Sequence, residues 1–362
     1  MIASIGVGNS MLSVSDKLWK LGKYGIPVGT CYSVGIAGYT LGGGFGLNSR
    51  KFGLAVDRLT GIEIVTADGM LRKVCENRDK DLFWALRGAG GGNFGIVTKF
   101  YFHLFDVSQK YVWVIKYYSC NQFQEIFYKW QNWMLTNIPD SITSFLSTKD
   151  NPCAIKLSIM NYNVNLIESE IQMELIRNIF PNITESDIMY GSHLDALKPI
   201  SSDYWTLNVT SQFYHKSKGF FVSKILTKDE IGVIAKSLEK RPFIGFAFEM
   251  HGGAINRVMR RKMSYVHRTS LYVAQFKFFL YVRNNTLEET ITRGKLYEDE
   301  LNSLITELQF MSNGEHYQNY VDNDLANWFS EYYKENGKRL KRIKRIFDSE
   351  NFFFFNQSIP VL

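Results

Sequence analysis

The stretch Gly29–Gly46 reads GTCYSVGIAGYTLGGGFG and holds seven of the 28 glycines of the chain. A second stretch, Arg87–Gly95, reads RGAGGGNFG and adds five more. Glycine at this density allows positive φ angles and close backbone approach, at an entropic cost that contact with a bound group can offset. Two such loops in one half of the chain predict backbone amides laid against a large, flat, anionic ligand, although either loop alone could be only a tight turn.

Neither loop matches the common nucleotide-binding patterns. Neither lies between a strand and a following helix with the spacing G-x-G-x-x-G, and neither ends in Gly-Lys-Ser/Thr. Cys31 lies inside the first loop, where its thiol could be a nucleophile, a structural group or a covalent anchor for a cofactor. The loops therefore predict a ligand site of another class.

Composition narrows the class of protein. The 362 residues are 45% hydrophobic and 15% aromatic, which suits two domains with sizeable cores. The net charge of +7 is modest, and the basic run 334–345 has an apolar face at helical spacing, so we expect a solvated helix and no nucleic-acid partner. No apolar run is long enough to span a bilayer, and the four cysteines show no metal spacing. We therefore expect no membrane span, no metal and a monomer.

Periodicity and turn signals predict the order of the elements. A first α+β lobe should end near residue 106, and a sheet covered by helices on one face should follow it. The expected strands are 3–8, 26–30, 59–65, 70–74, 95–105, 111–118, 143–149, 154–161, 244–250 and 271–281, and the expected helices are 14–21, 79–86, 121–135, 165–178, 228–239 and 287–311.

Five ordered blocks of this sequence resemble the berberine-bridge-enzyme-like family of FAD-linked oxidases, which includes oligosaccharide oxidases. They are the first glycine loop, TADG with DLFWALRGAGGGNFGIVT, GGAI with HR..LY..QF, YQNYVD, and the end YYKENGKRLKRIKRIFDSENFFFFNQSIP. The resemblance implies an α+β fold: part of a PCMH-type FAD-binding lobe (1–106), an antiparallel substrate-binding sheet covered by helices (107–318), and a C-terminal segment returning to the lobe (319–362).

The same resemblance implies the activity and its residues. The expected reaction is hydride transfer from an alcohol or sugar hemiacetal, such as an oligosaccharide, to FAD, with molecular oxygen as acceptor and hydrogen peroxide as product. Tyr320 would be the base, which requires a neighbour or cation to lower its pKa from about 10. Tyr317 is the competing base, and Gln275 would orient the substrate hydroxyl.

The family's flavin-binding positions fall on both loops and on the C-terminal segment. Cys31 matches the cysteine that links to the flavin ring, and Val34 matches the position lining its oxygen-accessible side. Asn356 belongs to a glycosylation sequon that burial beside the flavin would keep unmodified. The remaining matched positions are Gly35, Gly38, Gly42, Gly43, Gly91, Gly92, Phe94, Gly95, Ile96 and Val97.

One departure concerns the start of the chain. Family members carry an earlier lobe with a pyrophosphate-binding loop and a histidine that forms the first covalent flavin bond, and no residue here matches that histidine. The resemblance therefore implies an N-terminally truncated member, with a secretory location only if a missing region carries a signal peptide. The alternatives are a non-catalytic remnant and a carbohydrate-binding module without flavin.

Overall fold

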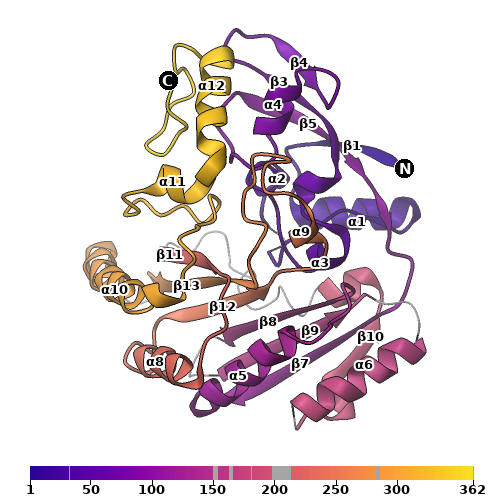
Figure 1. Cartoon of the computed structure of the whole chain (residues 1–362), viewed down its shortest axis with the longest axis vertical. Coiled ribbons are helices and arrows are strands. Elements are labelled where there is room, and N and C mark those ends of the chain that lie inside the picture. The colour runs from indigo at the N-terminus through magenta and orange to yellow at the C-terminus, as the bar shows by residue number, and fades with distance from the viewer. Residues whose placement is uncertain are drawn as a thin grey trace.

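The computed structural model describes residues 1–31, 33–149, 154–162, 166–180, 182–197, 213–282 and 286–361. Within these ranges a four-stranded sheet organises an upper lobe, and a seven-stranded sheet organises a lower domain (Figure 1). Helices accompany both sheets, and the strand pairs within each sheet are antiparallel. The predicted α+β class is confirmed.

The upper sheet has the order β1-β5-β3-β4. Its strands alternate apolar and polar residues, so that one face buries residues such as Phe100 and Phe102 of β5. The bounds of the elements of this lobe are β1 Ile2–Gly6, α1 Met11–Gly22, α2 Ile36–Leu41, α3 Ser49–Phe52, β3 Leu59–Val65, β4 Leu71–Val74, α4 Lys80–Ala85 and β5 Ile96–His103.

The prediction of a strand at 26–30 is wrong. A short strand β2 (Tyr24–Gly25) pairs instead with β6 (Phe105–Asp106). Beyond it, the Val28 N–H donates to Asn48 Oδ1 at 3.1 Å, and the Val28 carbonyl accepts from the Leu47 N–H at 3.1 Å. A side chain and a loop therefore satisfy this backbone in place of a neighbouring strand.

The lower sheet has the order β10-β7-β9-β8-β12-β13-β11. Two of its strands, β10 and β11, were not predicted from the sequence; in β11 the polar run 215–218 obscures the apolar pattern. The bounds are β7 Tyr111–Ser119, β8 Ile142–Lys149, β9 Ala154–Asn161, β10 Ile188–Gly191, β11 Phe213–Val222, β12 Gly245–Met250 and β13 Tyr272–Tyr281.

Helices cover one face of this sheet, as predicted (Figure 1). The longest predicted helix ends earlier than expected: α10 stops at Glu307, and a 3-10 turn occupies Gln309–Met311. The covering helices are α5 Phe123–Met134, α6 Leu166–Ile179, α8 Lys228–Glu239 and α10 Leu287–Glu307. Among the described residues no helix is long and apolar enough to cross a membrane.

The C-terminal segment returns to the upper lobe (Figure 1, yellow). It contains α11 (Trp328–Tyr333) and α12 (Gly337–Phe347), and α12 packs beside α4. A short helix from an earlier part of the chain, α9 (Ala254–Arg257), lies between the two sheets. The Lys344 ammonium, fully buried, donates to the Asn93 carbonyl of the second glycine loop at 2.8 Å. The C-terminal residues are thus part of the structure that supports the glycine loops.

Candidate active site

Three segments that are far apart in the sequence meet at the face of the lower sheet that the helices leave uncovered. The two glycine loops are bonded directly, because the Gly90 N–H donates to the Leu41 carbonyl at 2.9 Å. The segment Tyr317–Tyr320 joins them, since Asn319 Nδ2 donates to the Gly38 carbonyl at 3.0 Å. The sequence blocks singled out above therefore form one site.

Some of the predicted cofactor-binding glycines are required by the packing of the chain itself. A Cβ added at Gly42 would lie 2.0 Å from Asn319 Oδ1, and one at Gly43 would lie 2.4 Å from the Tyr265 ring. At Gly95, where φ is +150°, a Cβ would lie 2.2 Å from a backbone carbonyl of β3. Protein atoms, and no ligand, occupy these three positions.

Other positions of the loops do fit a flat polar cofactor. A Cβ added at Gly35 or Gly38 would meet nothing within 4 Å, and both residues are exposed. Within the described residues, the N–H groups of Gly91 and Gly92 have no backbone partner, so they can donate to a ligand. Cys31 and Val34 are partly exposed, Cys31 with its thiol 3.8 Å from Thr30 Oγ1. A thiol, open backbone and unbonded donors suit a bound flavin nucleotide.

The rest of the predicted cofactor positions divide between core and surface. The side chains of Phe94 and Val97 are buried in the apolar core of the lobe, whereas Ile96 is exposed, as strand alternation requires. Asn356 is exposed, so the prediction that its side chain is buried is wrong. The two residues that follow it, Gln357 and Ser358, are buried.

Glu249, a titratable group of the site, was not predicted from the sequence. Glu249 lies on β12 opposite Val273 of β13, and its side chain is buried. Burial raises the pKa of Glu249 to about 7, against the opposing effects of the Lys277 ammonium and of a hydrogen bond from Tyr320. A carboxyl group poised near neutral pH is suited to accept and release protons.

Tyr320 lies beside this carboxyl group. Its ring covers Gly219 of β11, where an added Cβ would lie 3.2 Å from Cδ2. Burial, the charge of Glu249, Tyr317 and Cys31 all raise the pKa of Tyr320 well above 10, and so does the hydrogen bond to Glu249. The expectation that a neighbour lowers this pKa is therefore wrong, because a carboxylate and not a cation faces the hydroxyl.

Tyr317, the competing base, is held differently. Its hydroxyl oxygen accepts from the Gly44 N–H at 3.3 Å and from Asn319 Nδ2 at 3.0 Å. Its ring lies 4.7 Å from that of Phe45 and 5.1 Å from that of Tyr320. Burial raises the pKa of Tyr317. The hydroxyl therefore supports the first glycine loop, and Tyr320 is the tyrosine that contacts Glu249.

Gln275 lies on β13 in the same row as Gly219, under the Tyr320 ring. Its amide is already bonded, because Nε2 donates to Ser217 Oγ at 2.8 Å and Oε1 accepts from Lys277 Nζ at 3.1 Å. The predicted role of Gln275 in orienting a substrate hydroxyl would require one of these bonds to give way. Gln275 instead holds Lys277, whose charge acts on Glu249.

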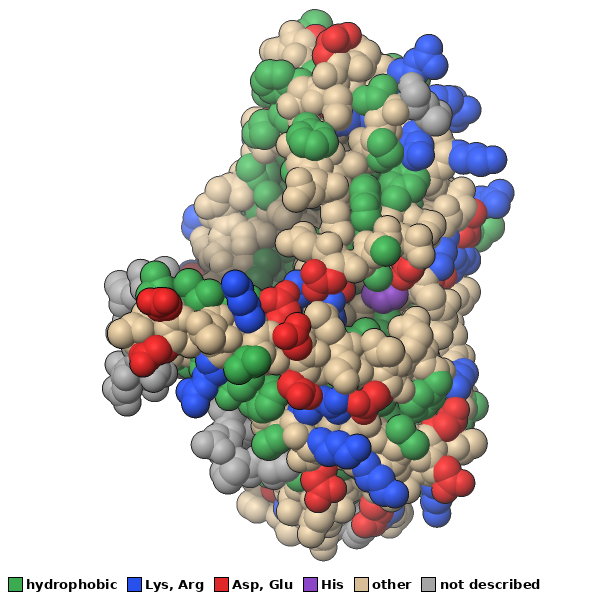
Figure 2. All heavy atoms as spheres, turned by 90° about the vertical axis from the view of Figure 1, so that its left-hand side faces the viewer, with side chains coloured by type: hydrophobic (Ala, Val, Ile, Leu, Met, Phe, Trp, Pro, Cys, Tyr) green, Lys and Arg blue, Asp and Glu red, His purple; other side chains and the backbone are tan. Residues whose placement is uncertain are grey.

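A cavity of about 230 Å3 lies on the other side of β11 from Tyr320. Lys218 and Asp322 line it and form an ion pair at 2.9 Å, and His316 lies 2.7 Å from Glu331. Carboxylate side chains gather on this face of the molecule, where the two domains meet (Figure 2). Within the described part of the chain no group of three or more His, Cys, Asp or Glu side chains is arranged to hold a metal.

Comparison with known proteins identifies the family of the chain. The family model for the FAD binding domain matches residues 1–74, and the model for berberine and berberine-like proteins matches residues 316–360. A curated relative, the uncharacterized FAD-linked oxidoreductase YgaK of Bacillus subtilis, is 30% identical over 100% of this chain and 78% of its own length. Berberine bridge enzyme-like 2 of Arabidopsis thaliana is 28% identical over 99% of this chain and 72% of its own length.

Solved structures show the same fold. Physcomitrella patens BBE-like 1 superposes with a TM-score of 0.84 at 27% identity, over 100% of this chain and 78% of its own. Berberine bridge enzyme from Eschscholzia californica, at 20% identity, superposes with a TM-score of 0.87 over 100% of this chain and 77% of its own. The fold and the glycine-loop site define an FAD-linked oxidoreductase. The chain belongs to the berberine-bridge-enzyme-like family.

Proposed function

We propose that this FAD-linked oxidoreductase oxidises an alcohol or a sugar hemiacetal, with Glu249 as the proton acceptor and Tyr320 as the group that contacts the substrate hydroxyl. The observation that carries the proposal is the pair itself: a buried carboxyl group with its pKa near 7, hydrogen-bonded to a tyrosine beside Cys31. A carbohydrate-binding module has no use for a buried acid of this pKa, whereas an alcohol oxidase needs one.

The proton path follows from the two pKa values. Tyr320 stays protonated at neutral pH, because its pKa is raised, and it donates its hydroxyl proton to Glu249. As the substrate hydroxyl loses its proton to the Tyr320 oxygen, the tyrosine passes its own proton to the Glu249 carboxylate, so the tyrosine never becomes charged. Bound FAD supplies the hydride acceptor for the carbon-bound hydrogen. Glu249 then holds the proton until solvent removes it.

We propose further that Cys31 would anchor FAD covalently through its thiol and that Val34 would line the part of the site that molecular oxygen reaches. The partial exposure of both residues, and the position of Cys31 near Tyr320, support this arrangement. In the test, the unchanged protein should retain FAD after acid denaturation, and the Cys31→Ser variant should release it. Complete release of flavin from the unchanged protein would contradict the covalent bond and leave non-covalent binding.

The activity is tested with the purified chain loaded with FAD and mixed without oxygen with primary alcohols and reducing oligosaccharides such as cellobiose. We expect at least one class to bleach the flavin absorbance, and hydrogen peroxide to form when oxygen is admitted. A flavin that is bound but not reduced by any of these substrates would contradict alcohol or hemiacetal oxidation. A flavin that is reduced but not reoxidised by oxygen would contradict only the acceptor.

A further inference from the structure

Gln318 makes the only side-chain contact among the described residues that reaches both glycine loops with one amide group. Its side chain is buried, and Nε2 donates to the Gly42 carbonyl at 2.7 Å and to the Gly88 carbonyl. Gly42 closes α2 at the end of the first loop, and Gly88 begins the second. One NH2 group therefore bonds two loops whose sequences lie more than forty positions apart.

Each of the two carbonyls belongs to a glycine that packs closely against another segment of the chain. Gly88 has a φ of +125°, and a Cβ there would lie 2.3 Å from the Tyr265 backbone nitrogen, so only glycine allows this approach. At Gly42 the side chain of Asn319 fills the place of a Cβ. Each glycine is thus packed against its own neighbour, and the Gln318 amide links the two carbonyls.

The orientation of the amide follows from the donor and acceptor inventory. Two carbonyls accept hydrogen bonds and donate none, so the amide nitrogen must face them and Oε1 must face away. Oε1 then lies on the side of His267, whose pKa the interaction with Gln318 raises. Within the described residues neither Gln318 Oε1 nor His267 Nε2 has a hydrogen bond of ordinary geometry to any group. Rotation of the amide by 180° would set an oxygen against two oxygens.

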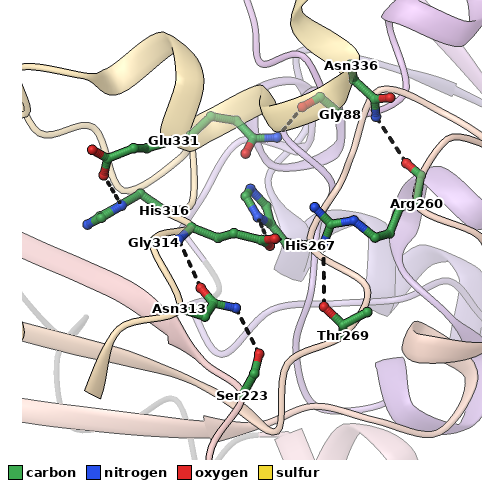
Figure 3. Close-up of polar contacts among 12 residues, drawn as sticks. Gly88, Ser223, Arg260, His267, Thr269, Asn313, Gly314, His316, Glu331 and Asn336 are labelled. Atoms are coloured by element: carbon green, nitrogen blue, oxygen red, sulfur yellow. Dashed lines mark hydrogen bonds and ion pairs between the residues drawn. The ribbon is translucent and has the colours of Figure 1, made fainter. Parts of the chain in front are cut away.

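His267 is fixed in turn by charged groups (Figure 3). Its Nδ1 lies 2.8 Å from Glu315 Oε2, and Glu315 Oε1 lies 2.7 Å from the Arg260 guanidinium. Arg260 also forms a bidentate pair with Glu335, at 2.8 and 3.0 Å. Burial lowers the pKa of His267, while the contacts with Glu315 and Gln318 oppose that effect. Ion pairs and hydrogen bonds therefore run from Glu335 to His267, and His267 interacts with Gln318.

We propose that Gln318 is a positioning residue that holds the two glycine loops at the separation the flavin requires, and that His267 and Glu315 fix the direction of its amide. The inference rests on the proposed function only for the identity of the ligand, since the bonds themselves are within the chain. Gln318 contacts backbone carbonyls and acts through them. His267 is the histidine of the sequence block HR..LY..QF, and the proposal gives it a specific role.

The first test needs no cofactor. Gln318→Glu is nearly isosteric, but a carboxylate cannot donate to either carbonyl. In the FAD-free chain we expect amide hydrogen exchange to accelerate about tenfold or more in residues 38–44 and 86–92 together, because the variant leaves two buried carbonyls without their donor. If Gln318→Glu does not fold, Gln318→Met, which is neutral and also lacks donors, replaces it with the same expectation.

Gln131 provides the matched control. It is a buried glutamine of the lower domain whose Nε2 donates to the Leu226 carbonyl at 2.8 Å and whose Oε1 accepts from the Leu226 N–H at 2.8 Å. Gln131→Glu removes an amide donor of the same kind, far from the glycine loops. It should accelerate exchange around residue 226 and leave both loops unchanged. A general loss of stability would instead raise exchange in the loops in both variants.

The second test measures FAD affinity by flavin fluorescence. Gln318→Glu should weaken binding about tenfold, equivalent to about 1.4 kcal/mol, while Gln131→Glu changes it less than about twofold. Unchanged exchange in the loops, acceleration in one loop alone, or equal loss of FAD affinity in both variants would overturn the proposal. If the unchanged chain bound no FAD while Gln318→Glu still loosened both loops, the positioning role would stand and the proposed function would fall.

Discussion

The two faces of the seven-stranded sheet are built from the same strands and have opposite chemistry. On β12, Phe246, Phe248 and Met250 face the covering helices, and the residues between them, Ala247 and Glu249, face the glycine loops. On β13 the apolar positions likewise alternate with polar ones. The helix-covered face is largely an apolar core, although β11 also places Lys218 on it, and the loop-facing side carries Glu249 and the polar residues around it.

This difference separates stability from chemistry along a single strand. Phe248 and Glu249 are adjacent and both buried, yet one packs against aromatic rings and the other bonds to Tyr320. A change on the helix-covered face should therefore alter the free energy of unfolding with little effect on proton transfer. A change on the loop-facing side should do the reverse. The following experiments test that separation.

The largest effect is expected at Glu249. Glu249→Gln keeps the shape and removes the proton acceptor, so reduction of bound flavin by substrate should slow about a thousandfold, within the usual range for a general base. The rate is measured by anaerobic stopped-flow absorbance. The amide should leave the fold intact, since Tyr320 can still donate to its oxygen.

Two further variants test whether Glu249 is the base. Tyr320→Phe, which keeps the ring and removes the hydroxyl, should slow the same step about a hundredfold. Glu239→Gln, an exposed glutamate at the end of α8 on the helix-covered side, should change nothing. A normal rate in Glu249→Gln would assign the base to another group.

On the opposite face, Phe248→Ala should cost about 3–5 kcal/mol of unfolding free energy, because it leaves a cavity in the aromatic core. The Phe248 ring lies 4.9 Å from that of Phe127 and 5.0 Å from that of Phe246. Urea denaturation measures the loss. Val233→Ala, at an exposed position of α8, should cost less than about 1 kcal/mol. The two faces would not be separable if Phe248→Ala folded normally but abolished flavin reduction.

Each part of the site that could be predicted is a continuous stretch of sequence. The glycine loops, Cys31 and the segment Tyr317–Tyr320 each carry a recognisable local pattern, and the structure brings them together. Most strands were predictable because alternation is local, β12 among them. The strand β11 was missed, since its polar middle reads as a loop until β13 pairs with it.

Glu249 could not be recognised in the same way. In the sequence GFAFEM it is an ordinary polar position of an amphipathic strand, and its pKa depends on burial under Tyr320, a residue from another part of the chain. The one available signal was a carboxylate between two buried apolar positions. The direction of the Tyr320 pKa shift was wrong for the same reason, because the sequence does not show which charge faces a hydroxyl.

Stability should depend on pH through Glu249. Its pKa is about 7 in the folded chain against an ordinary 4.5, so the folded state binds the proton more tightly than the unfolded state. This contribution is complete below about pH 4.5 and is lost as pH rises to about 7, a change of about 3 kcal/mol. The measurement is the difference in unfolding free energy between the unchanged chain and Glu249→Gln from pH 4.5 to 8. A difference that does not vary with pH would contradict the raised pKa.

The smallest effect is expected at Lys277, on the loop-facing side of β13. Its ammonium charge lowers the pKa of Glu249 and so opposes the effect of burial. Lys277→Met keeps most of the aliphatic chain and removes the charge, so Glu249 should stay protonated to higher pH, and the midpoint of the pH profile for flavin reduction should rise by about one unit. The rate at the alkaline plateau should stay within a few-fold, because the base itself is intact. Stopped-flow measurement between pH 6 and 10 gives both quantities, with Lys224→Met, a lysine paired with Glu230 on the surface, as the control. A midpoint that stays in place or moves to lower pH would show that Lys277 does not set the charge of Glu249.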